Sequence, residues 1–210
     1  MINILLVDDH IIVREGLRRI IEDKNGIKIL EEASTGEEAL GLIIKKNFDL
    51  VLLDISLPGK NGLQTLKEIK KLKNPPPVLM LSMHAEEQYA MRAIKAGASG
   101  YLTKDSAPGK LVSAIKKISN GKKYISQEVA ELLITDLYHD ENKLPHEFLS
   151  DREFEIMKLI VKGNTAKKIS NNLSISDKTV STYRRRILKK LNLQNTPDLI
   201  HYAIDNKLSD

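Results

Sequence analysis

The sequence predicts a doubly wound α/β domain built on a five-stranded parallel sheet, followed by a smaller all-α domain of four helices. Three observations lead to this prediction. Strand-like apolar runs alternate with helix-period segments over residues 1–120, every periodic segment after Leu149 is helical, and a length of 210 residues suits two modest domains. Near-continuous apolar strands are typical of a parallel sheet that helices cover on both faces.

Five apolar segments are the predicted strands. In chain order they are residues 4–7, 27–30, 50–53, 78–81 and the short pair 101–102. Between them, apolar side chains recur every three or four residues, which is the period of an amphipathic helix. Three consecutive prolines at 75–77 end the third of these helices. The alternation of strand and helix indicates βαβ units, so we expect the strands to be parallel.

The pattern changes after Gly121. A helix is predicted over about residues 127–138, and the polar stretch 139–147 has no strand pattern, so residues 121–147 are interpreted as a linker. The predicted domains are therefore residues 1–120 and 148–210. In the second domain, Ser176 is a good N-cap and Asp177 suits the positive end of a helix dipole. These two residues predict a helix from Asp177 to about Lys190, after a short helix and a tight turn.

Composition limits the class of protein. No apolar run approaches the roughly 18 residues of a membrane-spanning helix, and the first residues do not resemble a signal peptide. We therefore expect a cytoplasmic protein that has no membrane partner. The chain has no cysteine, which excludes disulfides, thiolate catalysis and cysteine-based zinc sites.

Positive charge is concentrated near the C-terminus. The net charge is +5, and residues 164–193 hold eight Lys or Arg and a single acid, Asp177. Such a density is expected of a surface that meets the phosphates of a nucleic acid. The alternative is a solvated helix face.

Charged side chains follow three of the predicted strands. Asp8 and Asp9 close the first strand, Asp54 closes the third, and Lys104 comes just after the fifth. Ligands of open α/β sheets bind at this edge. Three carboxylates gathered there would repel one another unless a cation lay between them, and oxygen ligands favour Mg²⁺ over zinc. Alternatively, these aspartates only cap loops and begin a helix.

A carboxylate beside a metal ion and an ammonium group can attack a phosphoryl group, because both cations offset the charge of the incoming oxygens. Asp54 is the best-placed nucleophile of the set. Its surroundings resemble the receiver domains of bacterial two-component response regulators, in the stretches LVDDH (6–10), DISLPGKNG (54–62), LSMH (81–84) and GASGYLTKD (97–105). The resemblance covers essentially the whole first domain and implies a flavodoxin-like, CheY-like receiver fold.

The resemblance also implies roles for individual residues. Asp54 would accept a phosphoryl group from a sensor histidine kinase. Mg²⁺ would be held by Asp9, Asp54 and the backbone carbonyl of Ser56, with Asp8 supporting it through water. Lys104 would pair with the phosphoryl oxygens, and Ser82 would donate a hydrogen bond to the phosphoryl group. Tyr101 would then swing inward and change the surface around the fourth helix and the fifth strand.

The C-terminal domain resembles the LuxR-type helix-turn-helix of the NarL/FixJ class of response regulators, in LSDRE (149–153) and ISDKTV (175–180). Its second helix would enter the major groove. By position, Ser181, Thr182 and Arg185 would read bases, whereas Lys178, Arg184, Lys189 and Lys190 would contact phosphates. The predicted buried stripe of this helix is Val180, Tyr183, Ile187, Leu188 and Leu191. A basic four-helix bundle for protein contact is the alternative.

The two halves together predict a response regulator that is not an enzyme beyond phosphoryl uptake and autodephosphorylation. When phosphorylated at Asp54, it would bind double-stranded promoter DNA as a homodimer and regulate transcription, with RNA polymerase as a candidate partner. One rival is a phosphohydrolase, which needs a second acid; position 56, where such enzymes commonly carry Asp, is Ser here. The other rival is a regulator that works without phosphorylation, which would be expected to have lost its acidic site.

Overall fold

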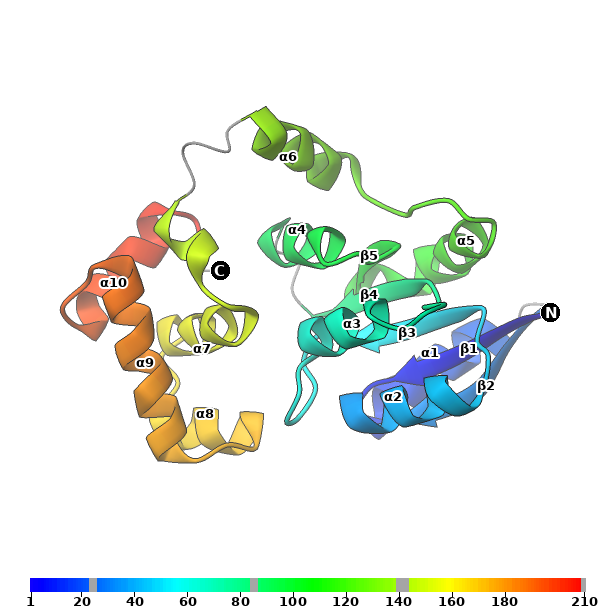
Figure 1. The fold of residues 1–210 in the computed structure, drawn as a ribbon, viewed down its shortest axis with the longest axis horizontal. Helices are drawn as coiled ribbons and strands as arrows, with labels where there is room; N and C mark the ends of the chain where they lie inside the picture. The colour runs from blue at the N-terminus through cyan, green and yellow to red at the C-terminus, as the bar shows by residue number, and fades with distance from the viewer. Residues whose placement is uncertain (23–25, 84–86, 139–143, 209–210) are drawn as a thin grey trace. The chain divides into compact units, whose positions relative to one another are not determined.

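The computed structural model describes residues 1–22, 26–83, 87–138 and 144–208. The chain forms two compact units, Met1–Tyr138 and His139–Asp210, which are described separately (Figure 1). Strands occur in the first unit, and the described part of the second unit is helical.

The first unit contains a five-stranded sheet. Its strands are β1 (Ile2–Val7), β2 (Ile27–Ala33), β3 (Leu50–Asp54), β4 (Val78–Ser82) and β5 (Gly100–Thr103). They lie in the order β2-β1-β3-β4-β5, and every neighbouring pair is parallel. The prediction of a doubly wound parallel sheet is confirmed, although each strand extends beyond its apolar run. Strand order reverses between β1 and β3, and such a switch point is where open α/β sheets bind ligands.

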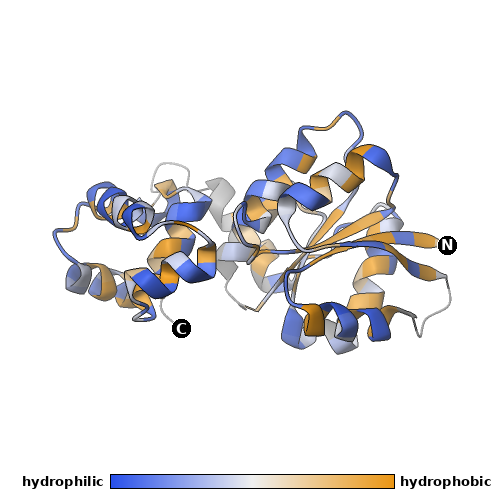
Figure 2. Ribbon diagram, turned by 90° about the horizontal axis from the view of Figure 1, so that it is seen from below, coloured by the Kyte–Doolittle hydropathy of each residue, from blue (hydrophilic) through white to orange (hydrophobic). Residues whose placement is uncertain are grey.

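Helices cover both faces of this sheet, and Figure 2 shows the apolar strands between them. They are α1 (Ile11–Glu22), α2 (Gly36–Lys45), α3 (Gly62–Lys70), α4 (Glu87–Lys95) and α5 (Ala107–Ser119). α1 packs with α5, and α3 lies between α2 and α4. The core beneath α1 and α5 is aliphatic and includes Leu6, Leu52, Leu81, Ile21 and Ile115, each fully buried.

A short segment extends the edge of the sheet beyond β5. Tyr124 N–H donates to Ser99 O at 2.9 Å, and Tyr124 O accepts from Tyr101 N–H at 3.2 Å, which forms a parallel bridge to Gly100. Helix α6 (Gln127–Tyr138) follows and packs on α4. The predicted helix is present, and it packs within the first compact unit, Met1–Tyr138. Residues 139–143 of the predicted linker lie outside the described residues.

The second unit consists of a 3₁₀ turn, η3 (Pro145–Phe148), and four helices: α7 (Asp151–Val161), α8 (Ala166–Leu173), α9 (Asp177–Leu191) and α10 (Thr196–Asp205). Four side chains cap the helix N-termini by accepting a backbone hydrogen bond from N3, namely Ser150, Thr165, Ser176 and Asn195. The predicted start of a helix at Asp177 is confirmed. Ser174 (φ 52°) is left-handed and makes the tight turn between α8 and α9.

Candidate functional sites

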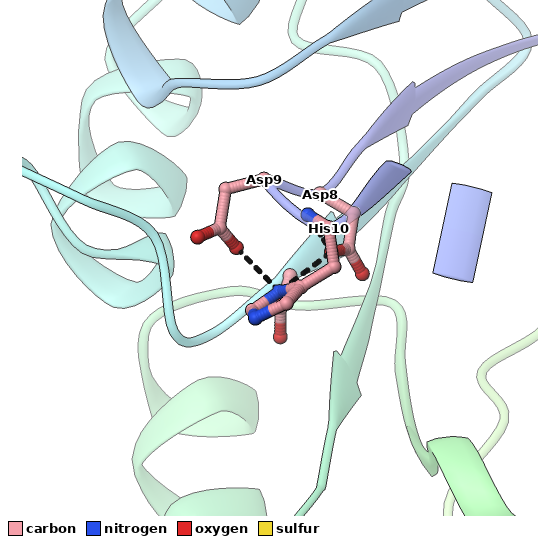
Figure 3. Close-up of side chains that lie close together, drawn as sticks. Asp8, Asp9 and His10 are labelled. Carbon is pink, nitrogen blue, oxygen red and sulfur yellow. Dashed lines mark hydrogen bonds and ion pairs between the residues drawn. The ribbon is translucent and has the colours of Figure 1, made fainter. Parts of the chain in front are cut away.

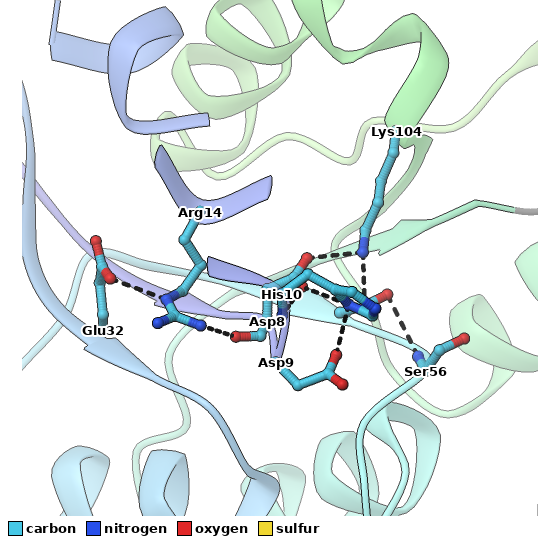
Figure 4. Close-up of polar contacts among 8 residues, drawn as sticks. Asp8, Asp9, His10, Arg14, Glu32, Ser56 and Lys104 are labelled. Carbon is cyan, nitrogen blue, oxygen red and sulfur yellow. Dashed lines mark hydrogen bonds and ion pairs between the residues drawn. The ribbon is translucent and has the colours of Figure 1, made fainter. Parts of the chain in front are cut away.

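The first site lies at the carboxyl ends of β1 and β3. Asp8 follows β1 and Asp54 ends β3, and because these strands are neighbours, both side chains reach the same edge. Asp8 is 0% exposed and Asp54 is 1% exposed. Lys104 stands in the turn after β5, and its Nζ lies 2.7 Å from Oδ2 of each aspartate (Figure 4). One ammonium group thus faces two buried carboxylates.

His10 is also part of this cluster, as Figure 3 shows. Its Nδ1 lies 2.8 Å from Asp9 Oδ1 and 3.4 Å from Asp8 Oδ1, and its backbone N–H donates to Asp8 Oδ1 at 2.9 Å. His10 was not among the predicted site residues. The signal that could have identified it is its position directly after the two aspartates.

The chain around the site is held by further hydrogen bonds. Arg14 Nη1 donates to the carbonyl oxygen of Asp8 at 2.6 Å, and its Nε donates to Glu32 Oε2 at 2.9 Å. The backbone N–H of Ser56 donates to Asp54 Oδ1 at 3.3 Å. These contacts tie the carboxylates to α1, β2 and the loop after β3, so the site is built from several elements. Arg14 was not predicted, because its partners are a main-chain atom and a distant glutamate.

The loop between β3 and α3 returns closely to Asp54. Gly62 N–H donates to Ile55 O at 2.8 Å, and Asn61 and Gln64 form a reciprocal capping box at the start of α3. A Cβ atom on Gly62 would lie 2.0 Å from the carbonyl oxygen of Asp54. The position therefore requires glycine for close approach of the two backbones.

Burial and charge shift the pKa values of the central pair. Burial raises the pKa of Asp54 above its ordinary value; the Asp8 carboxylate adds to this increase, and Lys104 offsets only part of it. Burial alone would lower the pKa of Lys104, but the two carboxylates outweigh it and raise that pKa. Lys104 is therefore protonated at neutral pH.

The cluster suits a small hard cation. Ligand atoms of Asp8, Asp9, His10 and Asp54 all lie within 4.8 Å of one another. Among the buried side-chain oxygen and nitrogen atoms of the described residues, Asp8 Oδ2 and Asp9 Oδ1 are the two that lack a hydrogen bond of standard geometry. Each still lies close to a nitrogen atom, Lys104 Nζ for Asp8 and His10 Nδ1 for Asp9. Oxygen atoms with unused lone pairs at this edge are the donors that Mg²⁺ prefers.

The two predicted switch residues lie on the neighbouring strands. Ser82 is fully buried at the end of β4, beside the strand that carries Asp54. Tyr101 is half-buried on β5 and lines a pocket together with Ala90 of α4 and Val129 of α6. The structure therefore brings Ser82 to the acidic edge and places Tyr101 in a pocket that α4, β5 and α6 line.

The second site is the outer face of α9. Most of the predicted DNA-contacting side chains are exposed, and Thr182 is half-buried; the exposed ones are Lys178, Ser181, Arg184, Arg185, Lys189 and Lys190. The opposite stripe faces the core through Val180, Ile187 and Leu191, which are buried, while Tyr183 and Leu188 are half-buried. The Ser181 and Thr182 hydroxyls donate to the carbonyl oxygens of Asp177 and Lys178 at 3.0 and 2.9 Å.

Lys190 and Arg184 of α9 contact neighbouring helices within the unit. Lys190 Nζ lies 2.6 Å from Glu153 Oε2 of α7, and Arg184 Nε donates to Thr196 Oγ1 of α10 at 2.9 Å. Burial would raise the pKa of Glu153, but hydrogen bonds from Lys190 and Ser150 outweigh it and lower that pKa. Lys190, predicted to contact phosphate, therefore joins α9 to α7 in this structure.

None of the helices formed by the described residues combines the length and apolarity that crossing a membrane requires.

The α/β unit with its acidic edge and the helical unit with its exposed basic helix define a receiver domain followed by a helix-turn-helix domain. Residues 4–116 match the family model of the response regulator receiver domain, and residues 147–203 match that of bacterial regulatory proteins of the luxR family. The chain belongs to the two-component response regulators that carry a LuxR-type DNA-binding domain, and it is a DNA-binding transcription regulator.

Several known response regulators match this chain over nearly its full length. The chain is 41% identical over 209 residues to the response regulator UvrY of Escherichia coli, covering 99% of this chain and 96% of UvrY. It resembles RcsB of Salmonella enterica serovar Typhimurium, solved bound to a promoter with the phosphomimetic BeF₃⁻, at 25% identity, 96% and 97% coverage and a TM-score of 0.60. A structure of two RcsB dimers bound to two parallel DNAs matches at 25% identity, 96% coverage of each chain and a TM-score of 0.58.

Proposed function

We propose that Asp54 accepts a phosphoryl group from the phosphohistidine of a sensor kinase, and that this modification increases binding of promoter DNA by a dimer. The observation that carries the proposal is the buried Asp54 carboxylate, whose Oδ2 lies 2.7 Å from Lys104 Nζ at an edge rich in acidic oxygens. Such a protein works in the cytoplasm, where the promoter DNA is, and RNA polymerase is the partner through which it would act on transcription.

In the proposed transfer, a carboxylate oxygen of Asp54 attacks phosphorus, and the bond from phosphorus to the histidine nitrogen breaks. Lys104 Nζ donates a hydrogen bond to Asp54, and during the transfer it can donate to the phosphoryl oxygens and stabilise their negative charge. Mg²⁺, held by Asp9, Asp54 and the carbonyl of Ser56 with Asp8 behind them, would supply the remaining positive charge. His10 contacts both Asp8 and Asp9 and would orient their carboxylates.

The phosphorylated site would act on the rest of the unit through Ser82 and Tyr101. Ser82 is the polar side chain at the end of β4, the strand next to Asp54. A hydrogen bond from its hydroxyl to the new phosphoryl group would draw the end of β4 toward the site. Tyr101 lines the pocket beside this region, so its inward swing would change the surface that α4 and β5 present.

On the DNA side, α9 would lie in the major groove. Because the Ser181 and Thr182 hydroxyls donate to carbonyls of their own helix, they would offer acceptor lone pairs to base amino groups. Arg185 would reach guanine, while Lys178, Arg184 and Lys189 would contact phosphates. Lys190 would support α9 through Glu153 instead of contacting DNA. A dimer would add a second half-site, in line with the RcsB dimers seen on DNA.

The test is to incubate the full chain with Mg²⁺ and a small phosphodonor and to measure its intact mass. We expect a lasting phosphoryl adduct on the wild type, none on Asp54→Asn, and much less when Mg²⁺ is removed by a chelator. An adduct that persists in Asp54→Asn would overturn the assignment. Steady release of phosphate without an adduct would indicate the phosphohydrolase instead.

The DNA half is tested on the same samples. The phosphorylated chain should retain a promoter fragment at lower protein concentration than the unmodified chain, and Arg185→Ala should lose most of this binding while still being phosphorylated. Equal retention by phosphorylated and unmodified protein would contradict control by phosphorylation and would favour a regulator that works without it.

A further inference from the structure

Two adjoining hollows on the first compact unit share one side chain, Lys70. The larger hollow, about 970 Å³, lies at the amino ends of the strands, away from the acidic site, and the smaller one lies along α3. Seven lysines line the two hollows, and we refer to them as the lysine band: Lys60, Lys67, Lys70, Lys71, Lys73, Lys122 and Lys123.

Acidic residues do not balance the lysine band. The acids among the described residues that line the two hollows are Asp49 and Glu68. Asp49 Oδ2 accepts from Asn3 N–H at 2.7 Å, and Glu68 Oε1 lies 2.8 Å from Lys71 Nζ, so Glu68 pairs with one lysine of the band. The first compact unit as a whole, residues 1–138, is nearly balanced, with 20 basic and 18 acidic side chains. The excess positive charge is therefore a local feature of this surface.

Lys70 connects the two hollows and is half-buried. Its side chain packs near Gly97, where a Cβ atom would lie 3.3 Å from Lys70 Cγ, and its Nζ donates to Pro76 O at 3.1 Å. Burial and the nearby charge of Lys123 both lower the pKa of Lys70. Lys123 belongs to the loop after α5, so tertiary packing holds ammonium groups from two segments close enough to repel each other. A bound anion would relieve that repulsion.

Compensation of helix dipoles does not account for the whole band. Lysines near the C-termini of α3 and α5 would offset the negative helix ends. Lys60, however, precedes α3, and Lys73, Lys122 and Lys123 lie beyond the last residues of their helices. The Lys70 ammonium contacts the carbonyl of Pro76, which belongs to the loop after α3. These positions favour a ligand outside the chain.

The distribution of the lysines indicates the shape of that ligand. A compact anion would require cations that converge on one point, whereas these cations extend from the larger hollow to the smaller one, which is lined by Lys67 of α3, by Lys60 before this helix and by Lys71 after it. An extended polyanion with regularly spaced charges fits such a surface, and the phosphate backbone of DNA has this character.

We propose that the lysine band binds the backbone of duplex DNA outside the sequence that α9 reads. The inference rests on the proposed DNA binding of the C-terminal unit, since a chain held on DNA by that unit meets this polyanion at high local concentration. The band would add sequence-independent affinity that weakens with salt, because each phosphate contact releases counterions.

The experiment uses the full chain and a random-sequence duplex of about 60 base pairs, with affinity measured between about 50 and 200 mM salt. The triple variant Lys73→Gln, Lys122→Gln and Lys123→Gln changes exposed residues of the band. The matched control, Arg19→Gln, Lys45→Gln and Lys110→Gln, removes the same charge from exposed positions outside both hollows. The band variant should lower the slope of log K against log salt by about 0.9 for each phosphate that the band no longer neutralises. The control should keep the wild-type slope.

Equal slopes for the two triple variants would overturn the inference while leaving the proposed function intact. Binding of tripolyphosphate, a compact anion, is measured on the same variants. The inference also fails if the band variant keeps the wild-type salt slope for the duplex and loses only tripolyphosphate binding, because the band would then bind a compact anion. Absence of random-duplex binding by the wild type would overturn the inference as well, whereas the proposed function is judged separately, by promoter binding of the phosphorylated chain. Thermal unfolding and phosphorylation of Asp54 in the band variant show whether the receiver remains folded.

Discussion

Lys104 Nζ lies 2.7 Å from Asp54 Oδ2, which joins the turn after β5 to the end of β3 across 50 positions in the chain. The same Nζ lies 2.7 Å from Asp8 Oδ2. A single buried ammonium group therefore compensates two buried carboxylates. The stability of the receiver and the reactivity of Asp54 consequently depend on the same side chain.

Replacing Lys104 by Met should destabilise the receiver, because it leaves Asp8 and Asp54 buried without their shared cation. Removing one partner of a buried ion pair typically costs about 3–5 kcal/mol. We expect Lys104→Met to lower the free energy of unfolding by an amount of this order in Mg²⁺-free buffer, measured by urea denaturation at pH 7. Lys110→Met, at an exposed position of α5, is the control and should stay within about 0.5 kcal/mol of the wild type. Matching midpoints for the two variants would refute the expectation.

Gly62→Ala should be far more damaging than an ordinary glycine substitution. Its Cβ would lie 2.0 Å from Asp54 O and 2.8 Å from Ile55 Cα, so the start of α3 or the end of β3 must shift. We expect a loss of at least about 2 kcal/mol, as in overpacked cores, together with slower phosphorylation of Asp54.

The matched substitution is Gly41→Ala in α2, where an added Cβ meets no atom within 4 Å. It should raise the free energy of unfolding by about 0.5–1 kcal/mol, since alanine favours helix. Thermal unfolding of both variants checks the pair, and a similar effect of the two substitutions would contradict the close approach of Gly62 to Asp54.

Stability of the helix-turn-helix unit should fall in acid through Glu153. The pKa of Glu153 is lower in the folded state than its ordinary value because of Lys190 and Ser150, so ionised Glu153 stabilises the fold. That contribution is present above the unfolded pKa of about 4.3 and is lost as pH falls through the folded value. Wild type should therefore exceed Glu153→Gln in unfolding free energy at pH 7, and the difference should shrink below about pH 4. Denaturant titrations at several pH values measure it; a difference that is independent of pH would disprove the ionic contribution.

Arg185 and Lys189 should affect DNA binding differently. Arg185→Ala should cost about 1–3 kcal/mol on the preferred sequence and relax base preference at one position, whereas Lys189→Ala should weaken all sequences and lower the salt slope by about 1. Lys190→Ala should leave the salt slope unchanged and reduce stability, because Lys190 pairs with Glu153. Binding to a selected duplex and to its scrambled version distinguishes the three variants. If the salt dependence of DNA binding were weaker for Lys190→Ala than for the wild type, Lys190 would be a phosphate contact after all.

Much of this protein could be predicted from local patterns. Continuous apolar runs and helix-capping residues depend on neighbours in the chain, so the five strands and the helix from Asp177 were predictable. The acidic edge followed from one topological rule, because the carboxyl ends of neighbouring parallel strands meet and bring Asp8 near Asp54. The sequence alone thus determined the fold class, the acidic cluster and the exposed face of α9.

Only the tertiary structure decided which side chains and helices come into contact. The pairing of Lys190 with Glu153 depends on the packing of α9 against α7, and the packing of α6 on α4 places a predicted linker helix in the first unit. The lysine band joins α3 to the loop after α5, two segments that have no common pattern in the sequence. Side-chain contacts of this kind depend on distances in space between elements far apart in the chain, and local periodicity contains no information about those distances.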